Sequence, residues 1–428
     1  MTPIASNALH SGFSSLHVAF LKRAADHGSD ASNGCALGAF LTLRLVDQFS
    51  AGKSANPDAL AYQIRATGDF LSDLHPRTIE VNHLAEVVRV AEGVLRNGKS
   101  RMLWPPLLAF AYWLEQELRL DEALDVLDTA ERLSDGQLAE EELATLMQRA
   151  RVLRRSGRLP DATACYKAAG ALALTLQDHH SELLSRVGRA IVLQKLGDLP
   201  ESERLLRGVL SDAQRQEDRQ AEAVASHDLA VALHLMGRNA EAPPLTFRAH
   251  ELYDQPLKKA MAMSDTGTML MELGQYAAAK DALLLVLSSS PPPNVRVRAE
   301  GELLALSALI QDRVSFERWR RNLQADYSEF PPDMQVDFEM KLGAGLGSFS
   351  RFQEGEEHLL RAVQLAEQHG LGENLFRAEG LLTELRERRG RMTPAATPPQ
   401  PAAPTPELRE TIESLRTLRA ERETLVGV

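Results

Sequence analysis

The feature that most constrains this chain is a short sequence signature that recurs at nearly constant spacing. Each copy has a turn, usually with Gly, then an apolar residue, and then a small residue that opens a second helix. Five clear copies lie 39, 40, 40 and 37 residues apart, and two weaker ones follow at intervals of 38; the repeated position falls on Ala123, Ala162, Ser202, Ala242, Ala279, Glu317 and Gly355. A fixed period of this length is typical of stacked helical units.

Small residues recur at two further fixed positions in the copies. Twelve residues before the repeated position stand Ala111, Ala150, Ala190, Ala230, Gly267, Ala305 and Gly343. Seven residues after it stand Ala130, Ala169, Val209, Ala249, Val286, Gln324 and Ala362, where Gln324 breaks the pattern. Two antiparallel helices approach to about 8–10 Å only where the residues at their crossing are small. The sequence therefore predicts a helix pair in each copy.

Composition agrees with an all-α chain. Aromatic residues make up only 5% of the 428 residues, and Ala, Leu, Glu, Arg and Gln are abundant. These residues lose least on entering a helix, whereas sheet-rich domains depend on aromatic and β-branched residues. We expect almost no strand.

The pattern over residues 104–364, with a partial eighth unit reaching 390, resembles the tetratricopeptide repeat family. The longer period, 37–40 residues instead of 34, is similar to that of bacterial regulatory proteins in this family. The resemblance implies a right-handed α-solenoid of about seven antiparallel helix pairs with an N-terminal helical cap. It also implies that the first helix of each pair lines a concave groove.

The rest of the chain divides by composition. We expect a loosely ordered N-terminus over 1–34 with a short helix near 15–26, and divergent helical cap units over 35–103. The repeat array then covers 104–390. A Pro/Ala-rich stretch, 391–406, is predicted to be an extended linker, and 407–428 a charged helix. That helix is either solvated or pairs through a short apolar seam, as a homodimer or on a partner.

Charge and motifs exclude several functions. A net charge of -11 argues against a nucleic-acid partner, which requires a concentrated basic surface. No apolar stretch is long enough to cross a membrane. Cys35 and Cys165 cannot form a disulfide framework, which fits a reducing, cytoplasmic location. We find no catalytic or metal-binding motif, so we expect neither an enzyme nor a cofactor or metal site.

The predicted groove offers the candidate binding residues. The family's inner-helix positions, placed relative to the small crossing residue, fall in this chain on Tyr112, Arg151, Arg154, Arg155, Gln194, Lys195, His227, His234 and Thr268. The middle of this set is basic and is mixed with apolar residues, which suits an acidic or C-terminal peptide because Arg binds carboxylates in bidentate fashion. Alternatively, these Arg residues form salt bridges with neighbouring Asp and Glu.

Two functions follow as hypotheses. The first is a non-enzymatic scaffold whose groove binds a peptide or a helix of a partner protein. The second is a bacterial sensory or regulatory module in which a small molecule or signal peptide acts through the C-terminal helix. An enzyme is a third, less favoured interpretation.

Overall fold

The protein is described here from a computed structural model, which defines residues 16–25, 30–50, 56–133, 138–391 and 403–426. Within these ranges every regular element is a helix, and the pairing of Ser50 with Leu133 is an isolated β-bridge. The chain separates into two compact units, residues 1–196 (unit 1) and 197–428 (unit 2), and each has an extensive apolar core of its own. The predicted all-α class is confirmed.

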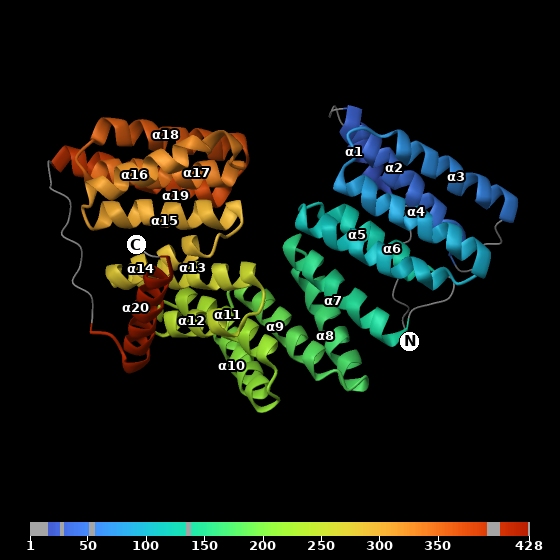
Figure 1. The fold of residues 1–428 in the computed structure, drawn as a ribbon, viewed down its shortest axis with the longest axis horizontal. Helices are drawn as coiled ribbons and strands as arrows, with labels where there is room; N and C mark the ends of the chain where they lie inside the picture. Colours follow the sequence, from blue (N-terminus) through green and yellow to red (C-terminus); the bar gives the residue numbers. More distant parts are fainter. Residues whose placement is uncertain (1–15, 26–29, 51–55, 134–137, 392–402, 427–428) are drawn as a thin grey trace, which may run out of the picture. The chain divides into compact units, whose positions relative to one another are not determined.

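Unit 1 contains nine described α-helices, and each packs on the next in chain order (Figure 1). They are α1 (Val18–Ala25), α2 (Asp30–Val46), α3 (Pro57–Asp73), α4 (Ile79–Asn97), α5 (Trp104–Gln116), α6 (Leu120–Glu131), α7 (Ala139–Arg155), α8 (Leu159–Thr175) and α9 (His179–Lys195). Local sequence explains their ends: the Asn56 side chain accepts a hydrogen bond from the Asp58 N–H at the start of α3, and Gly98 adopts φ +73° after α4.

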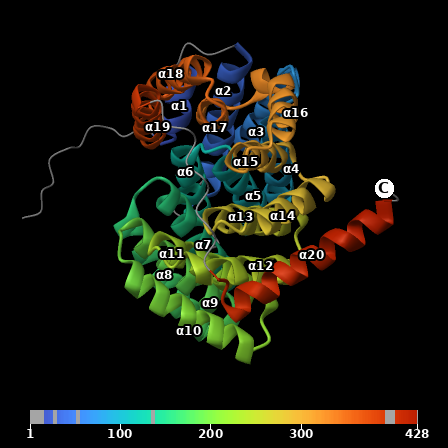
Figure 2. The ribbon, with the colours of Figure 1, turned by 90° about the vertical axis from the view of Figure 1, so that its left-hand side faces the viewer.

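Unit 2 contains eleven described α-helices, and all but the last of them again pack in chain order. They are α10 (Leu199–Arg215), α11 (Arg219–Leu235), α12 (Ala242–Leu252), α13 (Pro256–Glu272), α14 (Tyr276–Ser288), α15 (Pro293–Leu309), α16 (Arg313–Ala325), α17 (Pro332–Ser348), α18 (Phe352–Gln368), α19 (Gly372–Arg391) and α20 (Pro406–Val426). The last of these, α20, returns to pack on α14 and α12 (Figure 2).

The small residues lie at the helix crossings, as the sequence predicts. Ala111, Ala150, Ala190 and Ala230 are completely buried. Where a crossing carries Gly, the partner helix comes closer still: a Cβ atom on Gly267 would lie 2.8 Å from Leu283 Cγ. The helices of these pairs thus approach as the repeat pattern requires.

The sixth copy has a register one residue different from the one predicted. In the other copies the repeated position is the fourth residue of the second helix, or its start in α12, but in α16 the fourth residue is Phe316 and not Glu317. Phe316 is fully buried, and Leu304 and Leu323, not Ala305 and Gln324, occupy the two crossing positions. The predicted register was therefore wrong there, and the sixth copy has a buried Leu at each of these two positions. The cause is that the sixth copy carries large residues where the pattern expects small ones.

The turn between paired helices keeps one backbone geometry even where its Gly is replaced. Gly157, Gly197, Gly237 and Gly274 have φ between +73° and +82°, and the equivalent residues Leu118, Gln311 and Ser350 have φ between +59° and +62°. Left-handed backbone costs a non-Gly residue roughly 1–2 kcal/mol. Packing of the two helices imposes the turn on these three residues, so loss of Gly does not end the repeat.

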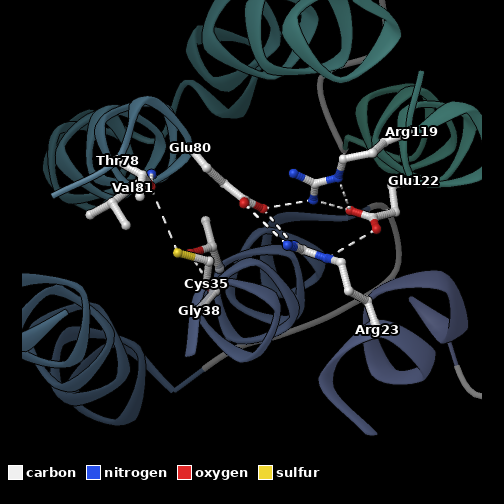
Figure 3. A network of polar contacts seen from close by, with 9 residues as sticks. Arg23, Cys35, Gly38, Thr78, Glu80, Val81, Arg119 and Glu122 are labelled. Atoms are coloured by element: carbon white, nitrogen blue, oxygen red, sulfur yellow. Dashed lines mark hydrogen bonds and ion pairs between the residues drawn. The ribbon is translucent and has the colours of Figure 1, made fainter. Parts of the chain in front are cut away.

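Unit 1 begins with a helix that is held by buried ion pairs. The Glu80 carboxylate accepts from both Arg23, at 2.6 Å, and Arg119, at 2.7 Å, and Arg23 also lies 3.1 Å from Glu122 (Figure 3). Burial alone would raise the pKa of Glu80, but the two guanidinium groups outweigh it and lower the pKa. These contacts join α1 to α4 and α6.

The described part of the N-terminal region includes a helix within the range 15–26, where the sequence predicted a short one. Within 1–34, α1 is a packed helix with Phe20 fully buried, and α2 already begins at Asp30. Residues 1–15 and 26–29 lie outside the described residues, as do residues 392–402 of the predicted linker.

Residues 406–426 form the C-terminal helix α20, and part of its apolar side packs against other helices of unit 2. Leu408 is 2% exposed, Thr411 4%, and Leu415 is fully buried against unit 2. The first part of the expected apolar seam, from Leu408 to Leu415, is thus occupied by contacts within the chain. The reason is that α12 and α14 supply an apolar surface that the sequence pattern of α20 alone does not reveal.

Candidate functional site

Unit 1 contains a groove of about 900 Å³ between the first helices of its repeats. It is lined by side chains from α4, α5, α7 and α9 together with the residue that precedes α9; they include His83, Trp104, Leu108, Tyr112, Trp113, Gln116, Glu140, Leu143, Ala144, Met147, Gln148, Arg151, Asp178, Ser181 and Leu184. Most of this lining is apolar or aromatic, and the few polar groups allow a ligand to be oriented.

Aromatic side chains build one wall of the groove. The His83 ring lies beside Phe110 and Trp113, with ring centroids 6.0 and 5.8 Å away, and Phe110 stacks on Trp113. Burial lowers the pKa of His83, so its ring is neutral near pH 7. Trp104 Nε1 donates to Thr145 Oγ1 at 3.1 Å, which fixes the indole between α5 and α7. This wall is uncharged and held in place before any ligand binds.

One face of α7 forms the floor. Ala144, Met147, Gln148 and Arg151 are spaced three or four residues apart and therefore share a helix face. Gln148 is only 4% exposed, and its Nε2 atom has no hydrogen-bond partner among the described residues. A buried amide donor without a partner is rare in folded proteins, which makes Gln148 the most unusual group in the groove.

The predicted arginines are paired instead of open. Arg151 Nη2 lies 3.1 Å from Glu115 Oε2, and Arg155 Nη1 donates to the Glu115 backbone carbonyl at 2.7 Å. The Arg151 guanidinium also lies 5.8 Å from the centre of the Tyr112 ring. The salt-bridge alternative considered from the sequence therefore describes Arg151 and Arg155, and only Arg151 and Tyr112 of the predicted residues in unit 1 line the groove.

The other predicted residues of unit 1 lie elsewhere. Arg154 bonds to the hydroxyl of Tyr166, whose pKa is raised by burial in spite of that contact. Gln194 is half-buried and Lys195 is exposed, and both stand at the end of α9 away from the groove lining. The residue spacing thus brings together two of the six predicted side chains of unit 1.

In unit 2, Thr268 lines a separate cleft of about 560 Å³ between α13, α15, α17 and α19. Its charged lining comprises five carboxylates, Asp265, Glu272, Glu302, Asp333 and Asp337, and three cations, Arg298, Lys341 and Arg377. Lys341 Nζ contacts Glu302 at 2.9 Å and Asp337 at 2.5 Å. This cleft is acidic, so the predicted basic floor does not extend into unit 2.

The two predicted histidines of unit 2 pair with carboxylates on α13. His227 Nε2 lies 2.8 Å from Asp265, and His234 Nδ1 lies 3.4 Å from Glu272. Burial by itself lowers the pKa of His227, but its hydrogen bond to Asp265 and the charge of that group outweigh burial and raise it. Both histidines join α11 to α13.

The described part of the chain holds neither a metal-binding cluster nor a membrane-spanning helix. No group of three or more His, Cys, Asp or Glu side chains there could hold a metal ion. None of the described helices has the length and the apolar character that crossing a membrane requires.

Several groove residues were missed by the sequence analysis. It placed ligand-facing positions three before and one, four and five after the small crossing residue. In the second copy the first two of these, Met147 and Arg151, line the groove, whereas Arg154 and Arg155 do not. The offsets missed Gln148, which lies two residues before Ala150, and the lining residues Trp104, Leu108 and Trp113 of α5. Helical spacing from Arg151 back to Gln148 and Ala144 was the signal that could have found this face.

No family model matches the sequence, and no curated protein does so either. Among solved structures, the chain is similar to the apo form of the quorum sensor NprR from B. thuringiensis, with TM-score 0.53 and 13% identity over 78% of this chain and 93% of that one. Others are a Rap protein complexed with Competence and Sporulation Factor (TM-score 0.43, 11% identity, 84% and 99% covered) and NprR with its cognate peptide NprX (0.39, 14%, 78% and 84%). The likeness to apo NprR concerns the fold, a tetratricopeptide-like α-solenoid.

Proposed function

We propose that this chain, with its tetratricopeptide-like fold, is an interaction scaffold that binds a peptide segment or a helix of a partner protein in the unit 1 groove. The observation that carries the proposal is the groove's apolar and aromatic lining, about 900 Å³ in volume, with polar groups at a few points. Peptide-binding helical grooves take apolar side chains in this way and orient them with few hydrogen bonds. The scaffold carries out no chemistry of its own.

The fold supports this proposal in a general way. Stacked helix pairs present the first helices of successive repeats side by side, which creates an extended surface for a partner. NprR, a quorum sensor of similar fold, is a protein that has been solved with a cognate peptide. The occupant of the groove in this chain is a matter for direct measurement.

The test is a pair of matched substitutions in the full chain. Met147→Asp places a charge on the groove floor, and Ala164→Asp places the same charge on the exposed side of α8. In quantitative affinity purification from the native cell, partners of the groove should be lost with Met147→Asp and retained with Ala164→Asp. Equal recovery of every partner by both variants and the wild type would contradict the proposal.

The sensory alternative requires that binding in the groove changes the C-terminal helix. The groove lies in unit 1, whereas α20, the helix through which a signal would be transmitted, packs on α12 and α14 of unit 2. A groove ligand would therefore have to change hydrogen exchange in α20 of the full chain. Protection confined to α5 and α7 favours the scaffold, and altered exchange in residues 406–426 favours the sensory module.

A further inference from the structure

We infer that the unit 1 groove selects an uncharged, apolar peptide segment, one of whose backbone carbonyls accepts a hydrogen bond from the Gln148 side-chain amide. This inference rests on the proposed function, because it specifies the chemistry of the occupant of the same groove. It differs from the acidic or C-terminal peptide that the sequence suggested.

The first observation is the unpartnered donor at Gln148. Its side chain is almost completely buried on the groove floor, yet Nε2 has no acceptor among the described residues. A buried donor without an acceptor raises the free energy of the unliganded protein. A ligand that supplies an acceptor therefore gains more binding free energy there than at an exposed donor. The donor therefore specifies one hydrogen-bond acceptor at this point of the ligand.

The second observation is the surroundings of that donor. Ala144 and Met147 on α7 and Leu108 on α5 line the same groove, and their apolar side chains would form no hydrogen bond with a polar side chain of a ligand. An apolar peptide segment nevertheless carries a carbonyl at every residue, and each carbonyl that loses water needs a donor. An apolar segment with a backbone carbonyl at Gln148 satisfies both requirements.

The third observation is the charge of the groove. Arg151 contributes its only guanidinium, and that group is paired with Glu115, which is 3% exposed and also holds Arg155. The remaining charged groups of the lining are the carboxylates of Glu140 and Asp178, and Asp178 caps α9 by accepting from the Ser181 N–H at 3.0 Å. A ligand carboxylate would compete with buried Glu115 and meet two like charges, so an acidic peptide is disfavoured.

The inference is tested with capped octapeptides, acetylated and amidated, in three sets that share a length: apolar and uncharged, Asp/Glu-containing, and Lys/Arg-containing. The apolar sequences are also made with a free carboxylate. Binding to the full chain is followed by fluorescence, because Trp104 and Trp113 both line the groove. We expect apolar peptides to bind best and their capped and free forms to differ by less than about twofold.

Two variants then separate the amide from the guanidinium. Gln148→Leu keeps the size of the side chain and removes the donor, so it should weaken every bound apolar peptide by about tenfold while the unliganded chain melts at an equal or higher temperature. Arg151→Gln should weaken the same affinities less than Gln148→Leu does, because its guanidinium is directed to Glu115. Gln148→Glu, which retains the shape and loses the amide donor, should lose the same affinity, whereas its melting temperature should fall because it buries a carboxylate.

The outcomes distinguish this inference from the function on which it rests. If either charged set binds more tightly, or if Arg151→Gln abolishes binding and Gln148→Leu does not change it, the inference is overturned and the peptide-binding function remains. If no peptide of any set binds and Met147→Asp has no effect on partner recovery, both are overturned.

Discussion

At the scale of single residues, His17 holds the start of unit 1 through two carboxylates. Its side chain is fully buried, with Nε2 3.1 Å from Asp47 and Nδ1 2.9 Å from Asp125, and Arg132 binds the other oxygen of Asp47. Burial alone lowers the pKa of His17, but hydrogen bonds and attraction to Asp125 and Asp47 outweigh burial and raise the pKa above 6.5. The charged imidazolium therefore stabilises the fold.

This raised pKa predicts a loss of stability with rising pH. The contribution of His17 is fully present below its unfolded-state pKa of 6.5 and is lost as pH rises through the higher folded value. Urea unfolding of the wild type and of His17→Gln, between about pH 6 and about pH 9, measures the difference. The advantage of the wild type should shrink as pH rises; an advantage that grows over this range would contradict the assignment.

Gly345 shows how the sixth repeat accommodates a large residue at a crossing. A Cβ atom on Gly345 would lie 2.3 Å from Phe316 Cε2 and 3.3 Å from Ala308 Cβ. Gly345→Ala should therefore lower the free energy of unfolding by about 1–3 kcal/mol. Gly380→Ala, in a helix where no atom lies within 4 Å of the added methyl group, should be neutral or stabilising by up to about 1 kcal/mol. Equal effects of the two substitutions in thermal unfolding would show that Phe316 can move aside.

At the scale of elements, α20 depends on its docking to remain a helix. It is rich in charge, and most helical stability in proteins comes from tertiary packing, so burial of Leu408 and Leu415 stabilises it. Leu415→Asp should release it and raise hydrogen exchange across residues 406–426, together with the facing part of α14. Arg416→Ala, at an exposed position of the same helix, is the control. Unchanged protection in Leu415→Asp would mean that other contacts hold the helix.

The elements also show how far sequence patterns reach. The period located the helix pairs and, in six of seven copies, the residues at their crossings, because 3.6-residue periodicity and small residues are local signals. The prediction failed in the sixth copy because the large Phe316 fits at its crossing only where the facing residue, Gly345, has no side chain. Such compensation joins positions 29 residues apart on two different helices, α16 and α17, so the periodicity of neither helix reveals it.

At the scale of the whole molecule, the chain has two compact units, each with a core of its own. In repeat proteins stability is carried mainly by contacts between neighbouring units, so damage remains local. Leu84→Ala in the core of unit 1 should remove about 2–5 kcal/mol and raise exchange in residues 56–133 more than in unit 2. Leu342→Ala should do the reverse. A uniform rise in exchange across both units in either variant would show that the chain unfolds as one.

The net charge of -11 does not predict the charge of the individual grooves. Sequence analysis suggested that a basic groove opposes an acidic surface. In the structure the unit 1 groove is mainly uncharged and the unit 2 cleft is acidic, because its cations are outnumbered by carboxylates. Charge counted along the helices did not reveal which groups neutralise one another.

The sequence by itself determined the helical class, the repeat and the residues at most helix crossings, since these depend on spacing within about 40 residues of chain. Only the tertiary structure decided which helix face forms the groove, that Arg151 and Arg155 both bind Glu115, and that α20 docks on α12 and α14. The physical reason is that pairing and burial are settled between side chains on different helices. Gln148 is the clearest case, because only burial without a partner distinguishes it from any other glutamine.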